Sequence, residues 1–330
     1  MTDTPTSTRR SIIWTLRIAA VVVVCWGVSG SVRNAFAQLS QHDWHVQPIW
    51  LVVSGGLYVL GLVPMGWFWQ RTLAALNYPT PLAAALRAYF LGHLGKYVPG
   101  KAVSVILRVA TVRKWVPPMR IALISTLMET LTMMASGAFL AAMMSIFVLH
   151  LDPVISLVAV GMACAAGAPT IPPVARLLAS LGIARDKRQE EAAGESPATP
   201  RADLTANLQG INYSLLATGW LAGCVCWLFQ ALSLWATLRA IGVENVSPIG
   251  DFPVLIAAVA FAVVAGFLSQ LPAGLGVRDA LLMQLLIPVC GAANALVAAV
   301  LMRLVWLVSE VIVCGILYIG AARKRTPPSV

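Results

Sequence analysis

The sequence predicts an all-α polytopic integral membrane protein, with about six spanning helices and two re-entrant helical hairpins arranged as an inverted repeat. Three observations support this prediction. Of the 330 residues, 59% are hydrophobic and only 11% are charged, whereas a soluble domain is roughly 25% charged. About eight apolar segments follow one another along the chain. Two of them are interrupted by glycine and proline at corresponding places, which is typical of transporters built from inverted repeats.

Six segments are long and apolar enough to cross a bilayer, which requires roughly 20 mainly apolar residues per helix. They are residues 12–32, 49–69, 121–149, 154–171, 215–238 and 293–320. The first is expected to be a retained helix. It is not followed by the small-residue cleavage site and soluble domain that a signal peptide would have.

Two further apolar regions, residues 81–112 and 252–289, are broken in the middle. The sequence Gly-Lys-Tyr-Val-Pro-Gly-Lys interrupts the first at residues 95–101, and Leu-Pro-Ala-Gly-Leu-Gly interrupts the second at residues 271–276. We expect each region to enter and leave the membrane on one side, the first on the cytoplasmic side and the second on the outer side. The alternative is that both breaks are kinks in ordinary spanning helices.

The positions of Lys and Arg favour a cytoplasmic location for both termini, because cytoplasmic loops are enriched in these residues. Residues 174–213 form the one long polar stretch, which is expected to be cytoplasmic and partly disordered. A single transmembrane domain over residues 1–330 is predicted. Its parts are a first inverted half at 1–150, a second at 154–173 and 214–321, and a cytoplasmic tail at 322–330.

The first break combines features of an anion site. Pro99 and Gly100 precede a helix that is predicted to start near Lys101, and the unpaired N–H groups at a helix start attract anions. Lys96, Lys101 and Arg108 add full positive charges. We therefore expect these three side chains, with the backbone of Gly100, to bind an anionic headgroup. The alternative is that the lysines only extend to the membrane surface.

The second break follows the same logic. Gly274 and Gly276 precede a helix whose first turn contains Arg278 and Asp279. An acidic residue suits a helix start, whereas a cation there is unfavourable. Arg278 would be tolerated if it bound an anion, so Arg278, Gly274 and Gly276 are predicted to bind substrate. The alternative is that Arg278 pairs with Asp279 or Glu310 and binds no ligand.

Polar residues also occur inside the predicted spans. One stripe lies on a single helix face because its members are spaced by four, three and four residues: Ser125, Glu129, Thr132 and Ser136. Arg303 and Glu310 share a face of the last span. Such groups are expected to face the protein interior or a wet cavity. Glu129, Asp279, Arg303 and Glu310 could form ion pairs or couple a proton, and the sequence leaves both open.

Several classes of function are not expected. The run from Gly95 to Lys101 matches most of a nucleotide-binding P-loop, but Ala102 replaces the Ser or Thr that would hold magnesium. His42 and His45 form only part of a metal site. The net charge of +10 lies mostly at the ends of apolar segments, which does not favour nucleic acid. No nucleophile–base pair is present, so no cofactor, metal or enzymatic activity is predicted.

The chain resembles the flippase-type transmembrane region of lysylphosphatidylglycerol synthases, a family of bacterial and archaeal membrane proteins, over most of its length. The residues that carry the resemblance are Tyr97-Val98-Pro99-Gly100-Lys101, Arg108, Met128-Glu129, the run 271–279 and Arg303. Where the family often has Gly-Glu, Glu-Arg and a second-motif Glu, this chain has Val103-Ser104, Glu129-Thr130 and Asp279. The resemblance implies movement of lipids between leaflets. Without a synthase domain, the chain is not expected to make the lipid.

We therefore expect a flippase-like protein of the bacterial cytoplasmic (inner) membrane, which moves an anionic or lipid-linked amphiphile between leaflets. Its expected partners are membrane lipids. Two alternatives remain open: a non-transporting scaffold or accessory subunit of envelope lipid synthesis, and an intramembrane transferase that acts on lipids. A polar cavity joining the two breaks would favour transport, whereas a dry, packed core would favour a scaffold.

Overall fold

The computed structural model describes residues 46–97, 102–116, 118–147, 152–193, 207–247, 249–269, 274 and 276–323. These residues form helices and connecting turns, and no strand occurs among them. The α-helices are α2 (Pro48–Ala75), α3 (Leu82–Leu94), α4 (Ala102–Val112), α5 (Met119–Phe147), α6 (Pro153–Gly167), α7 (Pro172–Ala193), α9 (Tyr213–Ala240), α10 (Phe252–Leu268), α11 (Val277–Cys290) and α12 (Ala292–Arg323). The short 3₁₀ turns are η1 (Gly95–Tyr97), η2 (Ala168–Thr170) and η3 (Leu208–Gly210).

Five of the described segments are long and apolar enough to cross a membrane. They are Pro48–Ala75, Met119–Phe147, Pro153–Thr170, Tyr213–Ala240 and Ala292–Ile319. Each corresponds to a predicted span, and the remaining predicted span, residues 12–32, lies outside the described residues. The prediction of an all-helical, polytopic membrane protein is therefore confirmed.

Local sequence signals set where several spans begin. Proline occupies one of the first two positions of α2, α6 and α10, where its missing N–H has no helical partner to lose. The Asp152 carboxylate accepts a hydrogen bond from the Val154 N–H at the start of α6 (2.8 Å). The Asn212 side chain accepts one from the Leu215 N–H at the start of α9 (2.9 Å). These caps satisfy N–H groups that would otherwise be unpaired in the membrane.

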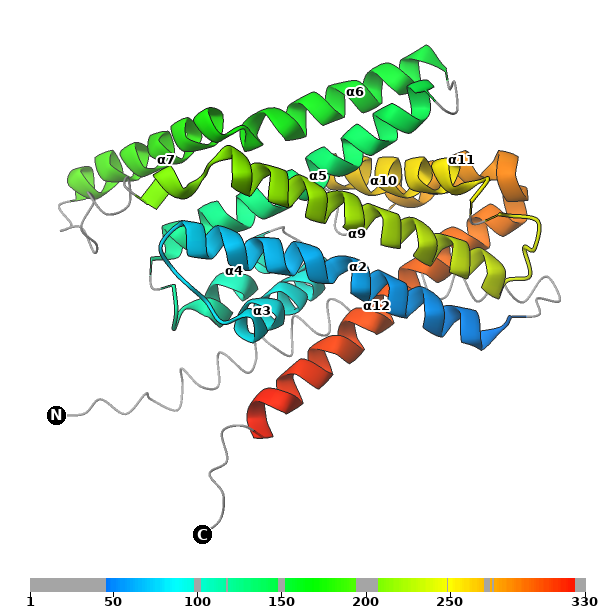
Figure 1. Cartoon of the computed structure of the whole chain (residues 1–330), viewed down its shortest axis with the longest axis horizontal. Coiled ribbons are helices and arrows are strands. Elements are labelled where there is room, and N and C mark those ends of the chain that lie inside the picture. The colour runs from blue at the N-terminus through cyan, green and yellow to red at the C-terminus, as the bar shows by residue number, and fades with distance from the viewer. Residues whose placement is uncertain are drawn as a thin grey trace, which may run out of the picture.

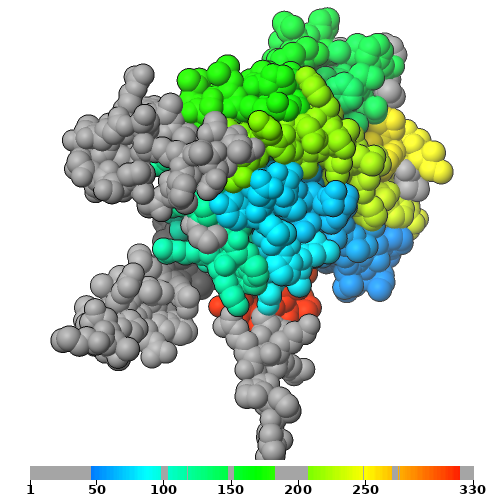
Figure 2. All heavy atoms as spheres, turned by 60° about the vertical axis from the view of Figure 1, so that its left-hand side comes forward, coloured from blue at the N-terminus to red at the C-terminus, as the bar shows by residue number. Residues whose placement is uncertain are grey.

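Helices α2 and α9 lie along one another at the centre of the bundle (Figure 1). The Ser54 hydroxyl on α2 donates to the Ser233 carbonyl on α9 (2.8 Å). Gly61 faces the Cys226 carbonyl and the Phe229 side chain, with no room for a larger residue. Small residues and interhelical hydrogen bonds are the usual means of holding membrane helices together. In Figure 2, α9 lies between α2 and the α6–α7 segment on the visible face.

Each broken region forms two short helices that pack on each other. The Ser104 hydroxyl on α4 donates to the Gly92 carbonyl on α3 (2.6 Å), so the chain reverses between them. In the second region, Gly266 of α10 packs against Gly274 and Arg278. The four helices have 13, 11, 17 and 14 residues, and each is shorter than the roughly 20 residues that a bilayer requires. Re-entry from one side of the membrane stays a prediction.

The packing of the two halves is reciprocal. Helix α3 of the first broken region packs on α12, and α10 of the second broken region packs on α5. Helices α5 and α12 are the spans that follow the first and second broken regions. Each half therefore supports the broken region of the other, as two equivalent units would.

The polar stretch at residues 174–213, expected to be partly disordered, contains an additional helix. Helix α7 continues to Ala193, and residues 194–206 lie outside the described part of the chain. Its Ala, Leu, Arg and Glu residues are strong helix formers, which explains why the composition of a polar linker produces a helix here. The apolar early turns of α7 also pack near α5 and η3.

Candidate functional site

The described charged residues predicted for the membrane interior fall into two groups, and all of them are buried except Lys96 and Asp279, which are partly exposed. The first is the pair Arg108 and Glu129. The second, which we call the polar cluster, consists of Tyr58, Lys96, Arg278, Asp279, Arg303, Trp306 and Glu310. Ionisable groups inside a membrane are costly and usually functional or paired, so the partners of each group decide its role.

Arg108 on α4 forms a buried ion pair with Glu129 on α5. The distance between Arg108 Nη1 and Glu129 Oε2 is 2.5 Å. The Tyr89 hydroxyl donates to Glu129 Oε1, and the Thr130 hydroxyl donates to Oε2, both at 3.2 Å. The Arg108 guanidinium also lies over the Tyr89 ring, 4.5 Å from its centroid. Both carboxylate oxygens of Glu129 are therefore satisfied, and Arg108 is engaged by the protein itself.

The predicted polar stripe on α5 faces the interior of the bundle. Ser125, Glu129, Thr132 and Ser136 are all at most 1% exposed. The Ser125 hydroxyl accepts a hydrogen bond from the Trp69 indole (3.1 Å). The Thr132 hydroxyl donates to the Met128 carbonyl one turn back (2.7 Å). The Ser136 hydroxyl donates to the Met133 carbonyl (3.0 Å). The stripe is therefore satisfied within the protein, and the Trp69–Ser125 bond joins α5 to α2.

Lys96 and Glu310 are the centre of the polar cluster. Lys96, on the turn η1 that follows α3, lies 2.5 Å from Glu310 Oε1 on α12. The Tyr58 hydroxyl on α2 donates to the same oxygen, and Lys96 Nζ donates to the Tyr58 oxygen at 3.1 Å. Glu310 is fully buried, whereas the Lys96 side chain is 28% exposed. Three segments far apart in sequence therefore converge on one carboxylate oxygen.

Arg278 lies in the first turn of α11 and is 6% exposed. Its guanidinium carbon is 4.5 Å from the centroid of the Trp306 ring, and Trp306 stacks on Tyr58 with ring centroids 4.2 Å apart. No carboxylate in the described part of the chain pairs with Arg278, and its Nη2 has no hydrogen-bond partner. Lys96 of the first break and Arg278, just after the second break, thus meet at the Tyr58–Trp306 stack.

Arg303 pairs with Asp279, not with Glu310. The distance between Arg303 Nη1 on α12 and Asp279 Oδ2 on α11 is 2.7 Å. Asp279 therefore has Arg303 as its partner, and Glu310 has Lys96. The sequence-based alternative in which Arg278 pairs with Asp279 or Glu310 is not what the described residues form.

Several buried polar atoms of the cluster lack a hydrogen-bond partner. They include Arg278 Nη2, Asp279 Oδ1 and Glu310 Oε2. The Tyr97 hydroxyl also lacks one in hydrogen-bond geometry, although it neighbours Glu310. An unpaired buried polar atom costs about 1–3 kcal/mol, and such atoms in native proteins usually meet water, an ion or a ligand. The only such atom in the first group is Arg108 Nε.

The polar cluster carries an excess of positive charge. Among the described residues it has three cations, Lys96, Arg278 and Arg303, and two carboxylates, which leaves a net charge of about +1. The three cations are close enough to affect one another electrostatically. The N-terminal end of α11 adds a partial positive charge. Of the other predicted site residues, Gly100 and Lys101 lie outside the described residues.

The glycines at the second break are required by the backbone. Gly274 and Gly276 have φ angles of +67° and +80°, a region that other residues adopt only at a cost. Gly274 also packs against the Gly266 backbone, where a side chain would have no space. These glycines allow α11 to start beside α10 and so bring Arg278 to Trp306.

Sequence reasoning did not identify Tyr58, Tyr89 and Trp306, which hold the charged residues in place. Tyrosine within an apolar span was the available signal, since a buried hydroxyl needs a partner. The described residues contain no group of three or more His, Cys, Asp or Glu that could hold a metal ion.

A family model described as the lysylphosphatidylglycerol synthase TM region matches residues 12–314. This range includes both breaks, the Arg108–Glu129 pair and the whole polar cluster. No curated protein sequence matches the chain.

Proposed function

Because the chain belongs to the family of the lysylphosphatidylglycerol synthase transmembrane region, we propose that it moves an anionic or lipid-linked amphiphile between the two leaflets of a membrane. Membrane lipids are then its partners, and the polar cluster binds their headgroups. Lys96, Lys101 and Arg278 are the headgroup-binding cations in this proposal. Arg108 is paired with Glu129 and has a structural role in this proposal.

The observation that carries the proposal is the state of Arg278. Arg278 is only 6% exposed, has no carboxylate partner among the described residues, and lies beside two further cations. An uncompensated ion away from water costs several kcal/mol. A phosphate placed on Nη2 would supply both the missing hydrogen bond and the missing negative charge. Arginine is well suited to this role because its donors match phosphate oxygens.

The unpaired acceptors support a headgroup that also donates hydrogen bonds. Asp279 Oδ1 and Glu310 Oε2 lack donors while lying in the same cluster as Arg278. A headgroup with one phosphate and an adjacent hydroxyl or amine would match both the cation and these oxygens. Lys96 and Asp279, each with a side chain 28% exposed, are the members of the cluster that such a headgroup could contact first.

The short helices support a route across the membrane. If both broken regions re-enter from opposite sides, as we propose, the cluster lies near the midplane, where transporter sites are commonly found. The basic residues near the chain ends and in the α7 region support a cytoplasmic location for both termini in a bacterial inner membrane. We propose no enzymatic step and no nucleotide, so the movement is passive, ion-driven or driven by a partner protein.

A second candidate function is a membrane scaffold or accessory subunit of envelope lipid synthesis. The sealed surroundings of Arg108 and Glu129 favour it, because they are what a packed, static interior would have. The two candidates differ in whether the polar cluster contributes to lipid movement.

The experiment compares two arginine substitutions in liposomes that contain fluorescent phospholipids. Arg278→Gln should lower transbilayer lipid movement about tenfold or more, because it removes the unpaired cation. Arg113→Gln is the matched control, since Arg113 is an exposed arginine just beyond the end of α4. It should leave the rate within about twofold of the unsubstituted protein. Equal rates for the two variants, with both proteins folded and inserted, would favour the scaffold.

A further inference from the structure

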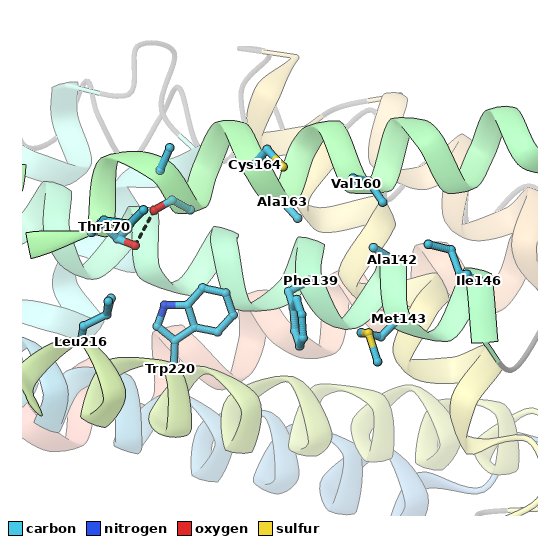
Figure 3. Close-up of a pocket in the computed structure, with 13 residues that line it drawn as sticks. Phe139, Ala142, Met143, Ile146, Val160, Ala163, Cys164, Thr170, Leu216 and Trp220 are labelled. Atoms are coloured by element: carbon cyan, nitrogen blue, oxygen red, sulfur yellow. Dashed lines mark hydrogen bonds between the residues drawn. The ribbon is translucent and has the colours of Figure 1, made fainter. Parts of the chain in front are cut away.

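A groove separate from the polar cluster lies between α5, α6 and the start of α9 (Figure 3). Its volume is about 530 Å³. The walls include Phe139 and Ile146 on α5, Val160 and Ala163 on α6, and Leu216 and Trp220 on α9. None of the lining residues belongs to the polar cluster, so the groove and the proposed headgroup site are two different sites.

The walls of the groove are suited to hydrocarbon. No charged residue lines it. The Thr170 hydroxyl, a polar group in the wall, donates to the Gly167 carbonyl at 2.7 Å, so it requires no further partner. An occupant would gain from dispersion contacts and would need no hydrogen bonds.

One wall of the groove is formed by the least enclosed of the five candidate spans among the described residues. Only 22% of the most apolar stretch of Pro153–Thr170 is buried, against 39% to 56% for the other four. Val154, Leu157 and Val158 on the same helix are exposed. In a membrane this surface faces lipid chains, so the groove opens to the hydrocarbon of the bilayer.

The length of the groove favours a lipid chain over a spanning helix. The lining residues contributed by α6 and the turn after it run from Val160 to Ile171. This length is about 16 Å at a rise of about 1.5 Å per residue. That is roughly half of the ~30 Å hydrocarbon core, or the depth of one leaflet. A lipid tail extends over about this depth of one leaflet, whereas a spanning helix would extend over the whole ~30 Å core, about twice the length of the groove.

We infer that this groove binds the acyl chains of a resident membrane phospholipid. Trp220 lies near Thr170 and Leu216 at one end of the groove, away from Ile146 (Figure 3). Tryptophan favours the boundary between lipid tails and headgroups. The headgroup of the resident lipid therefore lies at the Trp220 end, and its chains run toward Ile146 along α5 and α6.

The first test uses two alanines on the same helix. Ala163 lines the groove, whereas Ala165 is exposed and does not line it. The protein is reconstituted with a phosphatidylcholine that carries a diazirine on its acyl chain, transferred to detergent to remove bulk lipid, and irradiated. Adducts should map to residues 139–146 and 160–171. Ala163→Phe should reduce their yield at least fivefold, and Ala165→Phe should change it less than twofold.

A second groove-filling variant controls for misfolding of the first. Gly167→Leu also fills the groove, and a Cβ there meets only Ala135, at 3.8 Å. It should reduce the yield as Ala163→Phe does. Unchanged adducts in both filling variants would overturn the inference.

The second test asks whether protein covers the groove instead. Cys164 is an exposed groove residue, and Cys25 lies in the predicted helix at residues 12–32. In a protein that retains only these two cysteines, oxidation in the membrane should form no bond between them. An intramolecular Cys25–Cys164 disulfide would show that the first helix fills the groove. A Cys164–Cys164 dimer would show that a second copy covers it. Either outcome would overturn the inference.

Discussion

In each half of the chain, the helix after the break forms an ion pair with the next span, and the two pairs differ in two ways. Arg108 on α4 pairs with Glu129 on α5, and Asp279 on α11 pairs with Arg303 on α12. The order of the charges is therefore reversed. The first pair is sealed, with side chains 5% and 1% exposed. In the second, Asp279 is 28% exposed and its Oδ1 has no partner.

The two pairs differ in how completely their polar atoms are satisfied. Both carboxylate oxygens of Glu129 accept hydrogen bonds. The Tyr89 hydroxyl donates to Oε1, and Arg108 and the Thr130 hydroxyl donate to Oε2. Around Asp279, the neighbouring Arg278 stacks on Trp306 and leaves a donor unpaired. The first pair leaves one buried atom without a partner, Arg108 Nε, whereas Asp279 Oδ1 and Arg278 Nη2 both lack one at the second.

The largest effect is expected from breaking the sealed pair. Glu129→Ala leaves Arg108 buried without a counter-charge, so the free energy of unfolding should fall by about 3–5 kcal/mol. Titration with a denaturing detergent measures this change. The double variant Glu129→Leu with Arg108→Met should recover most of the loss, because it leaves no unpaired charge. No recovery would mean that packing rather than charge dominates this site.

A smaller effect is expected from the open pair. Asp279→Asn removes the charge that faces Arg303, but the site is partly exposed, so water can compensate in part. The loss of stability should be about 1–3 kcal/mol, less than for Glu129→Ala in the same titration. The exchange Asp279→Arg with Arg303→Asp copies the charge order of the first half and should restore stability. A loss as large as that of Glu129→Ala would show that the two pairs are equally sealed.

The smallest effect is expected at the aromatic ring beside the open pair. Trp306→Phe keeps a ring on Tyr58 but weakens the contact with Arg278. Both residues are buried, where a cation–π contact is worth about 2 kcal/mol, and the phenyl ring keeps part of it. The substitution also removes the 3.0 Å bond to the Ser233 hydroxyl. Binding of a fluorescent anionic phospholipid should weaken about two- to fivefold. Unchanged binding would separate Trp306 from the headgroup site.

Much of the fold could be predicted because membrane helices are limited by length and composition. The five described spans and the positions of both breaks follow from apolar runs and from glycine and proline. The burial of Arg108, Arg278 and Glu310 also follows, since charges inside an apolar stretch must face the protein. The helix at residues 12–32 and the contribution of Lys101 stay predictions.

The partners of the charged residues could not be predicted. Lys96 and Glu310 are 214 residues apart in sequence, and their contact depends on how η1, α2 and α12 pack. Arg303 and Glu310 share a helix face, yet each pairs with a different segment because α11 and η1 approach α12 at different heights. Spacing along one helix defines a face, but it does not say which other helix will meet it.

The carboxylate of Glu310 fixes a distance as well as a charge. One oxygen accepts from Tyr58 on α2 and from Lys96 on η1, so the reach of this side chain sets how far α12 stands from both. An aspartate, shorter by one carbon–carbon bond of about 1.5 Å, would carry the same charge and yet could not reach both donors from the same backbone. At this position the length of the side chain, and not its acidity, determines whether three segments can share one atom.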